Sequence, residues 1–171
     1  MNEIPVPDAI KRIADSKDRR LAWHFFILFS RFEYALKRHE GFLKKGTDRA
    51  EANWDLFASS HNAQFIPDST PQLQQAVLYF REHPPRKQTC ASGILSWTKP
   101  QAYDDHGPLL VWLLLVIRYV RNNLFHGGKF PLIPIEDPSR DRDLLVHALA
   151  ILSAALELDH QVKALFFDGI D

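Results

Sequence analysis

Two arginines, an asparagine and a histidine follow one another at the polar end of a single stretch of sequence. Arg118, Arg121, Asn122 and His126 come after nine consecutive apolar residues at positions 109–117. A guanidinium can bind a phosphate through two parallel hydrogen bonds, and an imidazole can accept or donate a proton near neutral pH. This combination is sufficient for RNA cleavage in which the ribose 2′-hydroxyl attacks its own phosphodiester. The four residues are therefore the candidate catalytic group.

Helical periodicity predicts how these side chains are arranged. Arg118, Asn122 and His126 are four residues apart and share one face of a helix, whereas Arg121 lies about 60° to one side of that row. Arg118 is consequently a rival to Arg121 for a phosphate. The same residues also suit an ordinary helix end, because cations favour the last turn and a glycine such as Gly127 commonly follows it. The spacing alone leaves both interpretations open.

Composition restricts the classes of protein and of site. The 21 Lys plus Arg balance the 21 Asp plus Glu, so attraction to nucleic acid must come from a local patch. The single Cys90 excludes an internal disulfide and a zinc finger. The eight histidines form no HxxxH or HExxH pair, so we expect no metal and no other cofactor. The apolar run is far shorter than the roughly 20 residues of a membrane span, which favours a cytoplasmic protein without a membrane anchor.

The pattern of apolar residues predicts an all-α fold, an up-and-down bundle of about four to five helices. Residues 1–17 are expected to be a loosely docked lead-in, and residues 18–171 a single helical domain. From Asp18 an amphipathic pattern predicts the first helix, with an apolar stripe from Leu21 to Leu36. Glu33 lies at the edge of this stripe and would need a partner if it points inward.

Capping residues predict where the next two helices begin. Asp48 with Glu51 three residues later predicts the start of a second helix. Its core residues would be Ala52, Leu56 and Phe57. Thr70 and Pro71 predict the start of a third helix, which would end before Pro84. The third helix would run through Leu73, Val77, Leu78 and Phe80.

The second half of the chain predicts two long helices after an irregular segment. Residues 86–107 show no sustained period and predict a long connection without strands. Pro108 opens the central helix and the glycines at 127–128 close it. From Asp141 a single final helix is predicted, with an apolar stripe that extends from Leu145 to Val162.

Residues 121–127, Arg-Asn-Asn-Leu-Phe-His-Gly, resemble the R-x4-6-H motif of the HEPN (higher eukaryotes and prokaryotes nucleotide-binding) superfamily, in which a polar residue directly follows the arginine. The segment FSRFEYALKRHEGFLKK is similar to the aromatic and charged opening helix common in that superfamily. The resemblance implies a helical bundle that forms a homodimer, with two copies of the motif facing one cleft. It also implies a metal-independent endoribonuclease in toxin–antitoxin, abortive-infection or CRISPR-linked defence, acting on RNA and accompanied by an antitoxin or a neighbouring defence protein.

The resemblance also implies roles for individual residues. Arg121 would bind and stabilise the scissile phosphate, and His126 would transfer the protons. Asn122 would hold the phosphate or orient its neighbours. Glu33 would pair with Arg121 and hold its guanidinium, provided that the first helix packs beside the motif.

Two residues outside the motif are further candidates for RNA binding. Lys129 follows the motif directly and could attract phosphate or face solvent. Trp97 lies beside Lys99 in the irregular segment and could stack on a base or anchor that segment to the bundle. The alternatives to the enzyme are a catalytically silent HEPN module that binds nucleotide or RNA or acts as a dimeric interaction scaffold, and an unrelated helical interaction protein.

Overall fold

The computed structural model describes residues 19–46, 48–125 and 138–169. Within these residues the fold is mostly helical, as the sequence predicts, but it has six α-helices instead of four to five and also contains a hairpin. In chain order the elements are α2 (Arg19–Arg38), α3 (Trp54–His61), the 3-10 turn η1 (Asn62–Gln64), α4 (Pro71–Glu82), β1 (Gln88–Ala91), β2 (Ile94–Trp97), α5 (Leu109–Phe125), α6 (Pro138–Leu156) and α7 (His160–Phe167).

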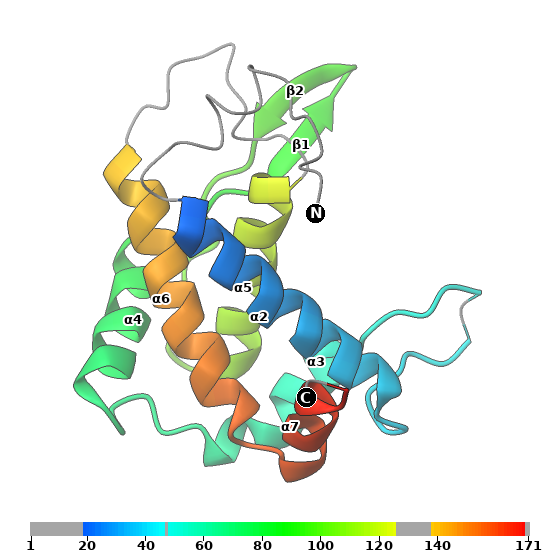
Figure 1. Cartoon of the computed structure of the whole chain (residues 1–171). Helices are drawn as coiled ribbons and strands as arrows, with labels where there is room; N and C mark the ends of the chain where they lie inside the picture. The colour runs from blue at the N-terminus through cyan, green and yellow to red at the C-terminus, as the bar shows by residue number, and fades with distance from the viewer. Residues whose placement is uncertain (1–18, 47, 126–137, 170–171) are drawn as a thin grey trace, which may run out of the picture.

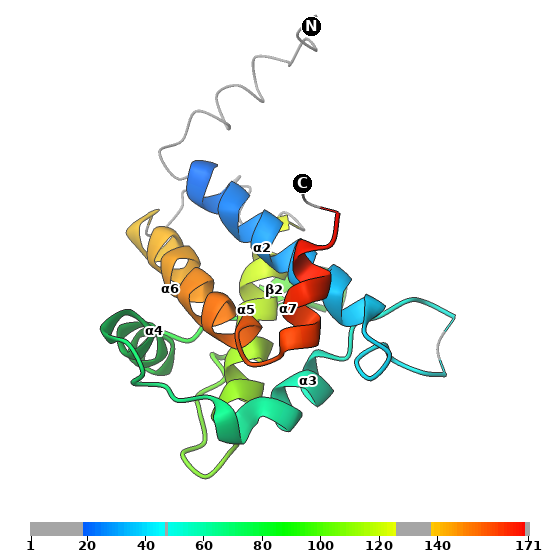
Figure 2. The same cartoon turned by 60° about the horizontal axis from the view of Figure 1, so that its bottom comes forward.

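Helix α6 occupies the middle of the bundle, between α2 and α4 (Figures 1 and 2). Helix α5 packs against both α3 and α6, and α7 packs against α2. Large side chains from three helices are fully buried where these elements meet, among them Phe32 of α2, Ile117 of α5 and Leu152 of α6. Burial of each such side chain stabilises the fold by about 1.5–3 kcal/mol, before the loss of conformational entropy is counted. This core fixes α2 and α5 on a common support.

The amphipathic pattern of the first helix is confirmed. Phe25, Phe29, Phe32 and Leu36 are buried, and they recur at spacings of three and four residues along α2. Two of these rings also meet the next helix: Phe29 stacks on Trp54 at a centroid distance of 5.0 Å, and Phe32 lies 5.1 Å from the same ring. The aromatic stripe therefore joins α2 to the start of α3.

The start and the end of α4 are also as predicted. The Oγ1 atom of Thr70 accepts a hydrogen bond of 3.1 Å from the backbone N–H of Leu73, and Pro71 is the first helical residue. The helix ends at Glu82, before Pro84. Leu73, Val77 and Phe80 of this helix are buried, whereas the side chain of Leu78 is 49% exposed. It lies beside the buried stripe of α4 instead of within it.

The predicted start of the second helix at Asp48 is wrong. The α3 helix begins at Trp54, where the side chain of Asn53 accepts from the N–H of Leu56. Glu51 is extended: its carbonyl accepts from the N–H of Lys44, and its carboxylate binds the Lys44 ammonium at 3.1 Å. Because strand-like pairing satisfies the backbone at this point, the capping box does not form. Of the three expected core residues, Leu56 is exposed, whereas Ala52 and Phe57 are buried.

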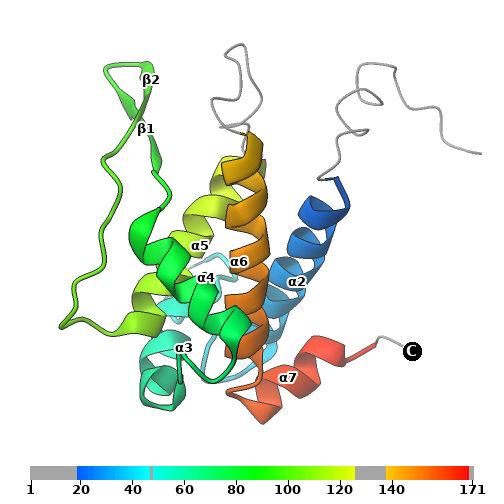
Figure 3. The ribbon, with the colours of Figure 1, turned by 90° about the vertical axis from the view of Figure 1, so that its left-hand side faces the viewer.

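The prediction that residues 86–107 contain no strand is also wrong. Strands β1 and β2 pair antiparallel, with Gln88 opposite Trp97 and Ala91 opposite Ile94. Ser92 and Gly93 connect them with positive φ angles of 53° and 78°, the combination that a two-residue turn matched to strand twist requires. The hairpin projects from the end of the bundle at which α5 ends and α6 begins (Figures 1 and 3). None of the side chains of β2 is fully buried, so the alternation that usually reveals a strand is absent.

The final helix is divided in two, contrary to the prediction of one helix from Asp141 that continues through Val162. Helix α6 ends at Leu156, and α7 begins at His160. Asp159 lies between them, and its carboxylate accepts from the N–H groups of Gln161 and Val162, each at 2.9 Å. A carboxylate in this position satisfies donors that a helix start leaves unpaired, which stabilises the break.

Candidate functional site

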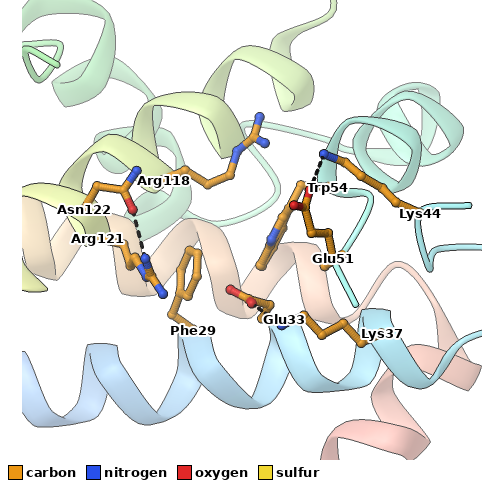
Figure 4. Close-up of a pocket in the computed structure, with 10 residues that line it drawn as sticks. Phe29, Glu33, Lys37, Lys44, Glu51, Trp54, Arg118, Arg121 and Asn122 are labelled. Carbon is orange, nitrogen blue, oxygen red and sulfur yellow. Dashed lines mark hydrogen bonds and ion pairs between the residues drawn. The ribbon is translucent and has the colours of Figure 1, made fainter. Parts of the chain in front are cut away.

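A charged surface pocket of about 210 Å³ lies between α2 and α5. It is lined by residues from three segments that are distant in sequence. They are Phe29, Glu33 and Lys37 of α2, Lys44, Glu51, Ala52 and Trp54 of the segment that leads into α3, and Arg118, Arg121 and Asn122 of α5. Figure 4 shows Arg121 of α5 beside Phe29 of α2, with the Glu33 carboxylate nearby, while the guanidinium of Arg118 turns away from both. Three of the residues that the sequence singled out on α5 therefore meet at a single pocket, and Glu33 joins them.

The apolar start of α5 explains why its polar end reaches this surface. Leu110, Leu113 and Ile117 are fully buried, and they recur along one face of the helix. The same helix therefore presents its polar side chains at the rim of the core once the apolar run ends. Arg118 and Arg121 are partly buried there.

Arg121 is held by two neighbours. Its Nη1 atom donates a hydrogen bond of 3.0 Å to the Oδ1 atom of Asn122, and its guanidinium carbon lies 5.7 Å from the centre of the Phe29 ring. An aromatic face attracts a guanidinium and restricts its rotation. A planar, oriented guanidinium of this kind suits an anion that accepts two parallel hydrogen bonds, such as a phosphate.

Arg118 is bound to a carboxylate. Its Nη2 atom lies 2.5 Å from Oδ1 of Asp55, and its Nε atom donates to the carbonyl of Leu114. Asp55 belongs to α3, so this ion pair connects α3 with α5. Although Arg118 lines the pocket, its guanidinium has a structural partner that a phosphate would have to displace.

Two lysine–glutamate pairs form the opposite side of the pocket. Lys37 and Glu33 are 2.6 Å apart and four residues apart on α2, and Lys44 binds Glu51 at 3.1 Å. The structure thus gives Glu33 a bonded partner, Lys37, and places it at the same pocket as Arg121. Pairing of Glu33 with Arg121 itself stays a prediction. The two lysines were not candidates from the sequence, because they reach the pocket only through the packing of α2 and the extended segment before α3.

Asn122 also borders a second pocket of about 230 Å³, on the side of α5 that faces the hairpin. Lys87, Gln88, Tyr119 and Asn123 complete its lining. Asn123 is buried, and its side-chain amide donates a hydrogen bond of 2.8 Å to the carbonyl of Arg86. This bond attaches the segment before β1 to the end of α5. Sequence reasoning gave Asn123 no role, although its spacing from Val120 marks it as a polar residue on the buried face.

The structure describes only one of the three remaining candidates, Trp97. Trp97 is in β2, 40% exposed, and lines neither pocket. His126 and Lys129 fall outside the described residues, as do the glycines predicted to close the helix. The described part of α5 ends at Phe125.

No protein-family model, curated protein or solved structure matches the chain. Within residues 19–46, 48–125 and 138–169, no group of three or more His, Cys, Asp or Glu side chains could hold a metal ion. No helix in the part of the chain that the structure describes is long and apolar enough to cross a membrane. The chemistry of the pocket therefore has to be argued from its own residues.

Proposed function

We propose that this chain is a metal-independent endoribonuclease of the HEPN type, with Arg121 and His126 as the reacting residues. The observation that supports this most is the placement of Arg121, which lines a charged pocket over the Phe29 ring with its guanidinium bonded to Asn122. His126 follows shortly after in the sequence. The resemblance of residues 121–127 to the superfamily motif points to the same pair.

In the proposed reaction, the imidazole of His126 takes the proton of the ribose 2′-hydroxyl. The 2′-oxygen attacks the adjacent phosphorus, the bond from phosphorus to the 5′-oxygen breaks, and that oxygen leaves with the proton that the imidazolium of His126 returns. The guanidinium of Arg121 stabilises the negative charge that develops on the phosphoryl oxygens, and Asn122 keeps the guanidinium oriented. The products are a 2′,3′-cyclic phosphate and a 5′-hydroxyl end.

The proposal includes the setting that the resemblance implies. The chain would act as a homodimer in the cytoplasm, with two copies of the motif at one cleft. An antitoxin or a neighbouring defence protein would control the cleavage. Neither Lys129 nor Trp97 is needed for the chemical step, and both would act only in holding RNA.

One observation favours the second candidate, a catalytically silent HEPN module. The carboxylates of Glu33 and Glu51 line the same pocket as Arg121, and each is paired with a lysine. A phosphate that enters the pocket meets these carboxylates as well as the cations, which weakens the attraction. In such a module the charged pairs would serve contacts with a nucleotide or a protein instead of catalysis.

Incubation of the purified protein with RNA in the presence of EDTA distinguishes the two candidates. We expect fragments that end in 2′,3′-cyclic phosphate, with cleavage about 10²–10³ slower in Arg121→Ala and lost in His126→Ala. Arg81→Ala is the matched control, because Arg81 lies on α4 and pairs with Asp105 away from the pocket. It should cleave at the wild-type rate.

If the wild-type protein binds RNA but leaves it intact, the ribonuclease proposal is refuted and the silent module is favoured. Fragments that persist unchanged in both Arg121→Ala and His126→Ala would assign the cleavage to a different site or to a contaminant. The chemical end of the fragments excludes contaminating nucleases that leave other ends.

A further inference from the structure

Helix α2 carries two exposed aromatic rings that stack on each other. Trp23 is 58% exposed and Phe26 is 39% exposed, and their ring centroids are 5.5 Å apart with an interplanar angle of 20°. Ile27 and Tyr34 are exposed on the same helix. Large apolar side chains gathered on one surface commonly mark a binding site. We call Trp23 and Phe26 together the aromatic pair.

The aromatic pair lies next to the charged pocket along α2. At about 100° per residue, Phe26 points within about 20° of Glu33, and Trp23 within about 40° of Lys37. Glu33 and Lys37 both line the pocket. Phe26 lies about 60° around the helix and about 4.5 Å along its axis from Phe29, and Trp23 lies about 120° around and about 9 Å along. Because the Arg121 guanidinium lies over the Phe29 ring, a chain that contacts Arg121 can extend onto the aromatic pair.

Helix α2 is also strongly positive in a chain whose net charge is zero. Its sequence holds five arginines and lysines and one carboxylate, a net charge of +4, and its first turn has no acidic residue. One of these cations, Arg31, donates to the backbone carbonyls of Phe166 and Asp168. Because carbonyls are neutral, these hydrogen bonds do not cancel its positive charge. A surface that interleaves cations with exposed aromatic rings complements a polyanion that has flat bases.

The charge argues against a second copy of this chain as the occupant. In a two-fold dimer through this face, each α2 would meet an identical α2, so two basic helices would come together, even though Asp168 pairs with Arg38. Double-stranded RNA does not fit either, because its bases are stacked inside the helix and offer no free face to an aromatic side chain. A nucleic acid with unpaired bases complements both features of this face, its exposed ring faces and its cations.

We propose that the aromatic pair is a stacking platform for the bases of single-stranded RNA whose backbone reaches Arg121. The ring of Trp23 stacks on a base further along the strand whose phosphate is in the pocket, and the cations of α2 attract the flanking phosphates. The inference rests on the proposed function for the identity of the ligand as RNA. It requires binding only, not cleavage.

The test titrates the protein with a single-stranded oligoribonucleotide that carries 2′-O-methyl groups and cannot be cleaved by 2′-hydroxyl attack. The background variant is Trp97→Phe, which removes the other exposed tryptophan of the described residues, since Trp54 and Trp112 are buried. The Kd is measured from the fluorescence anisotropy of a dye attached to the oligonucleotide, and binding to the background protein should also quench the fluorescence of Trp23. In this background, Trp23→Ala should raise the Kd about 5- to 150-fold, the range for loss of one base-stacking contact.

Three controls separate stacking from other effects. Trp23→Phe keeps an aromatic face and should retain most of the affinity. Ile66→Ala removes an equally exposed apolar side chain, 59% exposed, that lies outside α2 and should leave the Kd unchanged. A duplex of the same sequence should bind with the same Kd to the background protein and to Trp23→Ala.

The inference is overturned if the single strand does not bind, or if Trp23→Ala and Phe26→Ala bind it as tightly as the background protein. It is also overturned if Trp23→Ala converts a dimer into a monomer in sedimentation without a change in RNA affinity, because the face would then be a contact between copies. Reduced affinity in Trp23→Ala combined with no cleavage by the wild type would remove the ribonuclease and keep the platform. Cleavage by the wild type combined with unchanged RNA affinity in Trp23→Ala would keep the ribonuclease and remove the platform.

Discussion

The Nη2 atom of Arg118 lies 2.5 Å from the Oδ1 atom of Asp55, across the contact between α5 and α3. One turn further along α5, Arg121 binds Asn122 and lies over Phe29. The two arginines were rivals for a phosphate in the sequence. Their surroundings give them different tasks, since Arg118 connects two helices and Arg121 is oriented within the pocket.

Arg118→Ala should therefore mainly lower stability, and Arg121→Ala should mainly lower the cleavage rate. Loss of the partly exposed Arg118–Asp55 ion pair should lower the free energy of unfolding by about 0.2–1 kcal/mol and change the cleavage rate little. Arg121→Ala should lower the cleavage rate by about 10²–10³, because it removes a donor to the developing charge. Urea unfolding and initial rates in EDTA measure the two effects. If Arg118→Ala abolished cleavage at unchanged stability, the phosphate-binding role would belong to Arg118 instead of Arg121.

Asn122 and Asn123 provide a second matched pair on adjacent positions. Asn123→Ala removes the buried amide that binds the Arg86 carbonyl, so we expect a loss of about 1–3 kcal/mol in the free energy of unfolding. Asn122 is exposed, and Asn122→Ala should change stability by less than about 0.5 kcal/mol while it slows cleavage. Equal losses of stability in the two variants would contradict these assignments.

Stability should depend on the protonation of His147. Burial lowers the pKa of His147 below its ordinary value of 6.5, and the carboxylate of Asp143 offsets part of this effect. The ring also packs on Tyr79 at 4.4 Å. Because the folded state disfavours the protonated ring, the unfolded chain binds that proton more tightly. The contribution is fully present above the unfolded pKa and is lost progressively as the pH falls through 6.5 toward the folded pKa.

The matched variant for this effect is His147→Gln, which keeps a polar side chain without a titrating ring. Its urea midpoint should fall less than that of the wild type between about pH 7 and about pH 5. Parallel losses in the two proteins would show that other groups carry the pH dependence.

Asp159 should hold the break between α6 and α7. Asp159→Ala removes the cap of α7 and the 3.3 Å contact with Nε2 of His61, so we expect a loss of about 1–2 kcal/mol in the free energy of unfolding. Asp159→Asn is the matched control, because an amide oxygen also caps a helix. It should lose clearly less than the alanine variant; an equal loss would place the stabilisation in the contact with His61.

The sequence predicts those elements whose signals are local. Thr70 and Pro71 mark the start of α4 because their own side chains determine it, and the stripe of α2 is visible because one face is buried. The hairpin has no buried face to produce alternation, and the sequence around Asp48 resembles a helix start although tertiary pairing with Lys44 makes Glu51 extended. The break at Asp159 was missed because apolar residues continue at helical spacing across it.

The candidate site also combines residues with a local sequence signal and residues that only packing brings together. The sequence located Arg121 and Asn122, because both belong to one short motif that follows an apolar helix. Lys37 and Lys44 could not be found in this way, since only the packing of α2 and of the segment before α3 brings them to the pocket. The partner of Arg118 was likewise hidden, because Asp55 is far away in sequence and reaches α5 through the contact between α3 and α5.

The most direct measurement compares two oligoribonucleotides that differ by a single 2′-hydroxyl at the cleaved position, in EDTA. Both should bind the wild-type protein equally, and only the one with the hydroxyl should be cut, leaving a 2′,3′-cyclic phosphate that Arg121→Ala produces far more slowly. Cutting of the 2′-deoxy substrate, or no cutting of either oligonucleotide, would contradict RNA cleavage at the Arg121 pocket.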